Sequence, residues 1–305
     1  MSLFCYNKLG DNMKKDNVVI EIVNLKKYYG KVRGVEDVSL KINSGEVYGF
    51  IGPNGAGKST TIRTIMGLIN KTSGDIFING KELDINDISL KKDIGYLSSE
   101  INLYDDLTVK EILDYHESFY DKKINKRRKE LVKLFLLDES KKIEDLSLGN
   151  SKKLGIILAL MHSPKILILD EATSGLDPIM QNTFYDLLLE EKKKGTTILY
   201  STHVLSEVSK ICDRFGFIKD GKIIKEDLVS NLEKENITYL TVVSNDIKSI
   251  KKELGLKVVF EDKTKVKFIN NLSPDILIEK LSKFKIDKLL VEEVSIEDLF
   301  IEYYK

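Results

Sequence analysis

The stretch "GPNGAGKST" at residues 52–60 decides the fold of this chain. The overlapping "SGEVYGFIG", residues 44–52, begins with a turn and continues as an apolar run that predicts a buried strand, and a helix is expected from about Lys58. Glycines at such a junction let successive backbone N–H groups converge on one point, where the helix N-terminus adds its dipole. The spacing G-x-x-x-x-G-K-[ST] therefore predicts a phosphate-binding loop between a strand and a helix.

Within this loop, Lys58 is expected to reach the β- and γ-phosphates of a nucleotide, and the hydroxyl of Ser59 is expected to ligate Mg²⁺. The backbone of the whole loop would surround the phosphates. The predicted cofactor-binding loop comprises Gly52, Pro53, Asn54, Gly55, Ala56, Gly57, Lys58, Ser59 and Thr60.

A second motif, "ILILDE" at residues 166–171, places two carboxylates at the end of a predicted buried strand. Ligands of open α/β folds bind at the C-terminal edge of the sheet, so both carboxylates are expected beside the phosphate loop. Asp170 is interpreted as the residue that holds Mg²⁺, directly or through water. Glu171 is interpreted as the general base that polarises the attacking water, so Glu171 and Lys58 are candidate catalytic residues.

Composition restricts the classes of function. The 305 residues include 48 Lys and Arg and 48 Asp and Glu, and this balance gives no general attraction to nucleic acid or anionic lipid. No stretch approaches the roughly 20 apolar residues that a membrane span needs, and the N-terminus lacks the apolar core of a signal peptide. The two cysteines, Cys5 and Cys212, lack metal-ligand spacing and are expected to be reduced cytosolic thiols. If the protein works at a membrane, another chain must cross it.

Two domains are expected after a flexible tail at residues 1–16. Strands alternate with helices over residues 17–231, which predicts a mostly parallel sheet with helices on its faces and a helical subdomain at about 100–162. Hairpin turns are predicted at Asn79-Gly80 and Asp220-Gly221. Residues 232–305 show the order strand-helix-strand-strand-helix-strand, which is typical of a small ferredoxin-like α+β domain.

The segment "LSLGN" (146–150) precedes "LILDEATSGLD" (167–177) along the chain. Together with residues 52–60, these motifs resemble those of ABC-type ATPases, and the likeness extends over about residues 18–230. The resemblance implies a P-loop ABC-type ATPase core, an α/β fold with a mixed sheet and a helical subdomain. It also implies ATP and Mg²⁺ as cofactors and hydrolysis of ATP to ADP and phosphate as the reaction.

The resemblance assigns three further site residues. Asp177 ends "SGLD" (174–177), which matches the family's loop across the dimer interface. His203 in "LYSTHVL" matches the family's switch histidine, a catalytic residue that contacts the γ-phosphate. Tyr29 in "KKYYGK" stands where the family stacks an aromatic ring on adenine, with neighbouring Tyr28 as the alternative.

The signature segment "LSLGN" implies a dimer. Ser147, Gly149 and the N–H groups that open a helix at about residue 151 are expected to form a second anion-binding helix terminus. In the family this surface meets the γ-phosphate that the other subunit holds. The resemblance therefore implies a head-to-tail homodimer in which both chains build each nucleotide site.

Two places depart from the family pattern. Ser99 in "IGYLSSE" replaces the usual glutamine, whose reach to Mg²⁺ and to the membrane partner a serine cannot reproduce. In the signature, Leu148 and Asn150 replace a glycine and a glutamine.

The loop "SSEINLYDD", residues 98–106, is the expected contact with a membrane partner. Its apolar and aromatic members, Ile101, Leu103 and Tyr104, are expected to be exposed in the isolated subunit. The alternative is that they pack under the neighbouring helical region, as most large apolar side chains do.

The type that this chain resembles is the ATPase of drug (daunorubicin-resistance-like) and bacitracin export systems. In those systems a short ATPase chain on the cytoplasmic face of the cell membrane drives a separate integral-membrane permease, and a small C-terminal domain ends in a motif like "SIEDLFIEYY", here residues 295–304. The prediction is therefore the peripheral, cytoplasmic ATP-binding subunit of an exporter, without a nucleic-acid partner. The alternatives are a soluble ABC-type ATPase that acts on ribosomes or DNA, and a regulatory nucleotide-binding module of low turnover, against which Glu171 argues.

Overall fold

The computed structural model describes residues 17–84, 87–120, 124–234 and 238–293, which form two compact units divided between Asp227 and Leu228. The division falls four residues before the expected start of the second domain at residue 232. The expected tail at residues 1–16 and the terminal motif at residues 295–304 lie outside the described residues.

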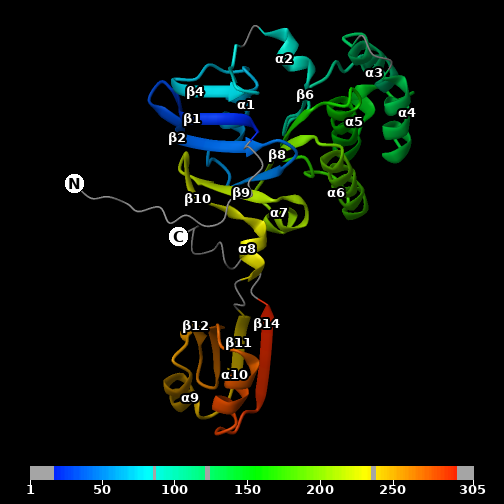
Figure 1. Cartoon of the computed structure of the whole chain (residues 1–305). Coiled ribbons are helices and arrows are strands. Elements are labelled where there is room, and N and C mark those ends of the chain that lie inside the picture. Colours follow the sequence, from blue (N-terminus) through cyan, green and yellow to red (C-terminus); the bar gives the residue numbers. More distant parts are fainter. Residues whose placement is uncertain (1–16, 85–86, 121–123, 235–237, 294–305) are drawn as a thin grey trace, which may run out of the picture. The chain divides into compact units, whose positions relative to one another are not determined.

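The first unit is built on a ten-stranded mixed sheet (Figure 1). The central strands are parallel, because β3 pairs with β8 and β9, β8 with β7, and β7 with β6. At the end of the sheet opposite β6 the strands are antiparallel, because β1 pairs with β2 and with β4, and β4 pairs with β5. The strand order is β5 (Lys81–Glu82), β4 (Ser73–Ile78), β1 (Val18–Tyr29), β2 (Val32–Asn43), β10 (Lys222–Leu228), β9 (Arg214–Lys219), β3 (Val47–Ile51), β8 (Thr197–Thr202), β7 (Ile166–Asp170) and β6 (Ile94–Leu97).

The helices of this unit divide into two groups. Figure 1 shows α3 (Val109–Glu117), α4 (Asn125–Leu134) and α5 (Leu148–Leu160) together beside β6, in the region expected to be helical. The others are α1 (Lys58–Ile65), the short α2 (Ile88–Lys92), α6 (Pro178–Lys193), α7 (Leu205–Ile211) and the 3₁₀ turn Ile143–Asp145. In the described part of the chain, no helix combines the length and apolarity that a bilayer span requires.

Local sequence signals explain where several elements begin and turn. Thr108 starts α3 with a capping box, in which its hydroxyl accepts from the N–H of Glu111 and the Glu111 carboxylate accepts from the N–H of Thr108. The first predicted hairpin turn is confirmed by positive φ at Asn79 (51°) and Gly80 (74°), and the second by positive φ at Asp220 (53°) and Gly221 (73°).

The parallel centre of the sheet positions the site. Every residue of β3, β7 and β8 is buried, as expected for strands covered on both faces. Parallel strands end at the same edge of a sheet, so the segments that follow these strands converge. Those segments are the phosphate loop after β3, Glu171 after β7 and His203 after β8.

The second unit confirms the predicted ferredoxin-like arrangement. Its sheet has the order β12 (Lys257–Glu261), β13 (Lys265–Asn270), β11 (Thr238–Val243) and β14 (Lys288–Glu293), with all neighbouring pairs antiparallel. Helices α9 (Ile247–Leu254) and α10 (Pro274–Leu281) contribute to one apolar core with the sheet. The helix α8 (Val229–Lys234) precedes this sheet.

Candidate active site

The loop between β3 and α1 has a backbone that only glycine permits at two positions. A Cβ on Gly52 would lie 2.2 Å from the carbonyl oxygen of Ile218, and one on Gly57 would lie 2.7 Å from that of Gly34. Gly57 also has φ 108° and occupies the N-cap of α1, where no side chain accepts from the helix and no acidic residue lies in the first turn. The N–H groups at this helix terminus therefore suit an external anion such as a phosphate.

Lys58 lies at the centre of this loop. Its side chain is buried, and its Nζ donates to the carbonyl oxygens of Gly52 (2.7 Å) and Pro53 (3.2 Å). The same nitrogen lies 3.8 Å from Oε1 of Glu171. Burial lowers the pKa of Lys58, while the carboxylates of Glu171 and Asp170 oppose that change. The cation is thus held between the phosphate loop and the two predicted site carboxylates.

Asp170 ends β7 as a fully buried carboxylate with one oxygen unsatisfied. Its Oδ1 accepts from the hydroxyl of Ser201 at 3.0 Å, whereas its Oδ2 is buried and has no hydrogen-bond partner among the described residues. An unpaired buried carboxylate oxygen costs free energy that a cation can offset. The described residues contain no group of three or more His, Cys, Asp or Glu that could hold a metal. A cation here would therefore depend on phosphate and water oxygens, as Mg²⁺ in nucleotide sites does.

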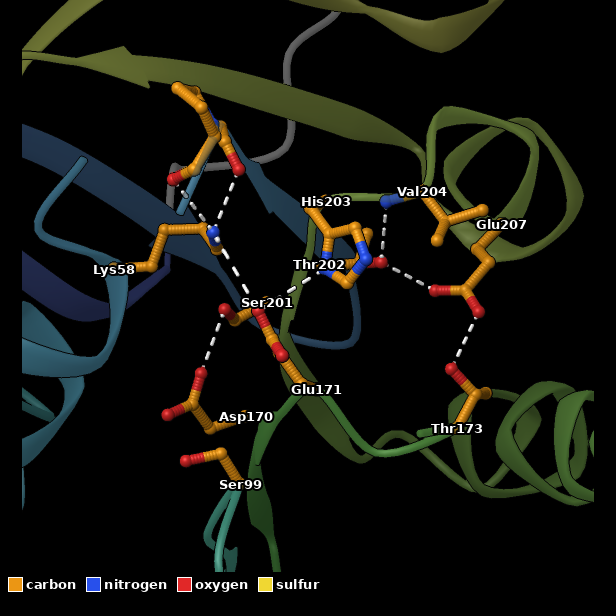
Figure 2. A network of polar contacts seen from close by, with 12 residues as sticks. Lys58, Ser99, Asp170, Glu171, Thr173, Ser201, Thr202, His203, Val204 and Glu207 are labelled. Carbon is orange, nitrogen blue, oxygen red and sulfur yellow. Dashed lines mark hydrogen bonds and ion pairs between the residues drawn. The ribbon is translucent and has the colours of Figure 1, made fainter. Parts of the chain in front are cut away.

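Glu171 adopts a left-handed backbone conformation, with φ 49°. Such a conformation costs about 1–3 kcal/mol for a residue other than glycine and persists where the surroundings enforce it. Here its N–H donates to the carbonyl of Ser201 at 3.1 Å. The side chain is 25% exposed and its Oε1 lies 3.2 Å from Nδ1 of His203 (Figure 2). The backbone strain therefore accompanies a carboxylate that lies between Lys58 and His203.

Lys152 is a site residue that the sequence interpretation missed. It belongs to α5, is almost fully buried, and its Nζ donates to the carbonyl oxygens of Ser99 (2.9 Å) and Glu171 (3.3 Å). Burial lowers its pKa, against the attraction of Asp170 and Glu171. The available signal was its position on the apolar face of a helix, in line with buried Gly155 and Ile156 three and four positions later. Lys152 links the loop after β6 to the main chain of Glu171.

The two tyrosines near the phosphate loop, Tyr28 and Tyr29, make different contacts. The hydroxyl of Tyr28 donates to Glu36, and this hydrogen bond raises the pKa of Tyr28. Tyr29 is 47% exposed. A Cβ on Gly34 would touch both the Tyr29 ring and the Cγ2 of Thr60, each at 3.0 Å, so the ring lies beside the phosphate loop. Tyr29 is thus the better placed of the two to stack on a base.

The signature helix begins earlier than expected. Helix α5 starts at Leu148 and not at about residue 151, because the Ser147 hydroxyl already accepts from the N–H of Asn150 at 3.3 Å and caps the helix. Leu148 is 71% exposed, and a Cβ on Gly149 would lie 2.9 Å from the carbonyl oxygen of Gly175. Gly149 therefore permits close approach between the signature and the segment that follows Glu171.

Asp177 caps α6 in this structure. Its Oδ1 accepts from the N–H groups of Ile179 and Met180, both at 3.0 Å. The predicted site residues thus form two groups. The phosphate loop, Asp170, Glu171 and His203 share one sheet edge, whereas the signature contacts the segment of Gly175 that leads to Asp177.

The loop after β6 meets the exposure expectation only in part. Tyr104 is 67% exposed, but Ile101 and Leu103 are half-buried. The prediction of exposure is wrong for both residues. Ile101 packs on α5, where a Cβ on Gly155 would lie 2.5 Å from the Cδ1 of Ile101, and Leu103 faces a groove beside the loop. This groove has a volume of about 240 Å³, and its lining includes Ile101, Leu103 and Ile143.

A phosphate loop beside a buried Asp and an adjacent, partly exposed Glu defines the class of P-loop nucleoside triphosphatases. Residues 35–174 match the family described as "ABC transporter". The lantibiotic transport ATP-binding protein SrtF of Streptococcus pyogenes is similar, with 41% identity over 71% of this chain and 95% of its own length. So are the linearmycin resistance ATP-binding protein LnrL of Bacillus subtilis (38%; 73% and 75%) and the bacitracin transport ATP-binding protein BcrA of Bacillus licheniformis (36%; 75% and 76%).

Solved structures agree with these relatives. The dimeric, post-hydrolysis ATP-binding cassette MJ0796 bound to ADP and Pi is 26% identical and covers 69% of this chain and 98% of its own, with a TM-score of 0.63. The chain belongs to the family of ABC transporter ATP-binding subunits. It binds ATP and is an ATPase of that family.

Proposed function

We propose that two copies of this chain close head to tail around two ATP molecules, and that hydrolysis energises a separate membrane permease which exports its substrate. The observation that carries the catalytic part is the position of Glu171. Its Oε1 lies 3.8 Å from Nζ of the buried Lys58 and 3.2 Å from Nδ1 of the exposed His203. A carboxylate held in this way can accept a proton from a water that attacks the γ-phosphate.

Each residue of the sheet edge has a proposed role. Lys58 exchanges its bonds to the carbonyls of Gly52 and Pro53 for the β- and γ-phosphates. Glu171 takes the proton of the attacking water. His203 orients Glu171 and contacts the γ-phosphate through the ring nitrogen that does not face Glu171.

Mg²⁺ fits the donors at this edge. The hydroxyl of Ser59, in the first turn of α1, and the unpartnered Oδ2 of Asp170 would hold it. When bound, the ion would neutralise negative charge that develops on the phosphates during hydrolysis.

The second group of residues is proposed to serve the partner's nucleotide. Ser147 and Gly149 lie at the start of α5, whose first turn contains no acidic side chain, so this terminus can meet an anion. The segment ending at Asp177 would cross to the other subunit, and Tyr29 would stack on the adenine of its own chain's nucleotide.

The permease is proposed to dock at the loop after β6. Exposed Tyr104 lies next to the groove whose lining includes Ile101, Leu103 and Ile143. Export is favoured because the similar proteins are named for bacitracin transport, lantibiotic transport and linearmycin resistance. The proposed location is accordingly the cytoplasmic face of the membrane, where the chain is held by the permease.

Substitution of Glu171 by Gln tests the catalytic part. Gln keeps the shape of the side chain but cannot take a proton, so turnover should fall about 10²–10⁴-fold while ATP still binds. The variant should accumulate as a dimer at saturating MgATP, measured by light scattering. Glu190→Gln, which changes an exposed glutamate of α6, is the matched control and should behave as the wild type. Near-normal turnover of Glu171→Gln would exclude Glu171 as base, and a monomeric variant would exclude the shared site.

The docking loop is tested by Tyr104→Ala in the complex with the permease. Because Tyr104 is exposed, its removal should leave the fold and the basal ATPase activity of the free subunit intact. Stimulation of ATPase activity by the permease in vesicles should be lost. Full stimulation of the variant would show that the loop does not dock the permease.

A further inference from the structure

Glu207 is a buried carboxylate that the mechanism above does not use. It lies in α7, is 5% exposed, and accepts four hydrogen bonds from hydroxyl groups. Oε1 accepts from Thr173 (2.6 Å) and Tyr185 (3.0 Å), and Oε2 accepts from Tyr200 (2.9 Å) and Thr202 (2.6 Å). These donors come from the segment after β7, from α6 and from β8, so one side chain joins three parts of the unit.

The four contacts match the chemistry of an ionised carboxylate. Burial and the neighbouring Glu207 raise the pKa of Tyr185 and of Tyr200, so both phenols keep their protons and donate. A carboxylate is an acceptor with about four lone-pair sites, which the four hydroxyls fill. In the described part of the chain, no basic side chain lies within ion-pair distance of Glu207, so hydroxyl groups alone satisfy it.

Two of the four hydroxyls, those of Thr202 and Thr173, belong to the segments that carry the proposed catalytic residues His203 and Glu171. Thr202 also accepts from the N–H of Val204 at 2.9 Å, and this bond fixes the turn that carries His203 (Figure 2). Thr173 lies in the segment after Glu171, where the N–H of Ser174 donates to the Glu171 carbonyl at 3.3 Å. Glu207 therefore holds the main chain on both sides of the contact between Glu171 and His203.

We propose that Glu207 is a positioning residue for ATP hydrolysis, which sets the separation of Glu171 and His203 through Thr173 and Thr202. The inference rests on the proposed roles of Glu171 and His203. It predicts a change in the rate of the chemical step, because misplacement by about 1 Å can cost about 10²-fold in rate. ATP affinity should be unchanged, since the phosphate loop makes its contacts elsewhere.

The first test is Glu207→Gln in the full chain, with kcat, ATP affinity and melting temperature measured together. Gln offers one acceptor oxygen and an N–H₂ group, so the two hydroxyls at one end of the side chain lose their acceptor. The expected result is a kcat lower by about 10²-fold with unchanged ATP affinity. A wild-type kcat would overturn the proposal.

A matched pair of variants separates positioning from stability. Thr202→Val and Tyr185→Phe each delete one hydroxyl that donates to the same carboxylate, but only Thr202 contacts the turn of His203. Both should lower the melting temperature, and only Thr202→Val should lower kcat. Equal loss of kcat in both variants would make Glu207 a stabilising residue and nothing more. This pair also decides the question if Glu207→Gln does not fold.

A double-mutant cycle identifies the residue through which Glu207 acts. His203→Ala with Glu207→Gln should be no slower than the slower single variant, because the second change removes a contribution already lost. Multiplied losses would overturn the proposal. If Glu171→Gln and His203→Ala themselves turn over normally, the proposed function of the site is wrong. If both lose activity while Glu207→Gln does not, only this inference fails.

Discussion

Asp170 and Glu207 are both buried carboxylates that take hydroxyl donors from β8, yet they are completed differently. Ser201 satisfies one oxygen of Asp170 and the other has no partner among the described residues, whereas Glu207 accepts four hydroxyl hydrogen bonds. A saturated buried carboxylate fixes the elements around it. An unsaturated one retains an acceptor for something that is not part of the chain. The number of donors thus separates a framework residue on α7 from a proposed ligand-binding residue at the end of β7, although both take donors from β8.

Asp170→Asn should produce the largest loss of activity in this comparison. Asn can still accept from Ser201 but carries no charge for Mg²⁺, so MgATP turnover should fall by at least about 10²-fold. The free energy of unfolding without nucleotide should change little. The cost of an unpaired buried charge is removed, while Lys58 and Lys152 lose a nearby negative charge. Urea unfolding and a steady-state ATPase assay measure both quantities, and a stability loss above about 3 kcal/mol would make Asp170 a framework residue.

In contrast to Asp170→Asn, Glu207→Ala should have a large effect on the free energy of unfolding. Four hydroxyls lose their acceptor, and buried groups left unpaired cost about 1–3 kcal/mol each where they cannot rearrange, so a loss of roughly 2–5 kcal/mol of stability is expected.

Glu191→Ala is the control for the Glu207 variant. Glu191 is as buried as Glu207 but contacts two cations, Arg127 at 2.5 Å and Lys194 at 2.8 Å. Both can turn toward water, so this variant should lose less stability than Glu207→Ala in the same urea titration. An equal or larger loss would show that a carboxylate with four hydroxyl donors does not stabilise the fold more than one paired with two cations.

A smaller effect is expected at a third polar centre, which is held neutral. His162 stacks on Tyr120 at 4.5 Å near His116, and burial with the neighbouring His116 lowers the pKa of His162 to about 4, against the attraction of Asp93. Burial lowers the pKa of His116 as well. The unfolded chain therefore binds protons first, so stability is complete above about pH 6.5 and falls as pH drops toward 4.

For His162 alone, the loss at pH 5 relative to pH 7.5 should be about 2 kcal/mol. His162→Phe keeps an aromatic ring for Tyr120 but does not titrate, so its stability should depend less on pH between 5 and 7. Urea unfolding at several pH values measures the difference. Parallel curves for the two proteins would contradict a neutral buried His162.

Of the two buried carboxylates compared above, the sequence predicts Asp170 as a site residue but does not predict the role of Glu207, and the reason is physical. The phosphate loop, the strand that ends at Asp170 and both hairpin turns are determined by neighbouring residues, and the structure shows them at the predicted positions. The partners of Glu207 lie 34, 22, 7 and 5 residues away. A contact of that kind depends on the order of strands in the sheet.

The dependence of contacts on strand order also explains why the sequence does not reveal the strand β6 or the role of Lys152. The strand β6 has only four residues, Ile94–Leu97, too few for a clear periodic pattern, and its parallel pairing with β7 places the following Ser99 near Glu171. Lys152 then reaches the carbonyls of both residues. A helix that begins at Leu148, three residues before the expected start, changes which of its N–H groups are free, and capping geometry decides that boundary.

The close approach of Gly149 to Gly175 bears on the timing of the two proposed hydrolysis events. Gly149 belongs to the segment that each chain would present to its partner's nucleotide, and Gly175 follows Glu171 of the chain's own site. Gly149 meets the backbone of Gly175, and the Leu148 side chain also packs against Gly175, so a displacement of one segment would be felt by the other. In the proposed dimer, a backbone displacement that follows phosphate release at one site would be transmitted through this contact to the other site. Because each chain has this contact, the transmission would act in both directions. The two sites would then hydrolyse ATP one after the other or at the same time, but not independently.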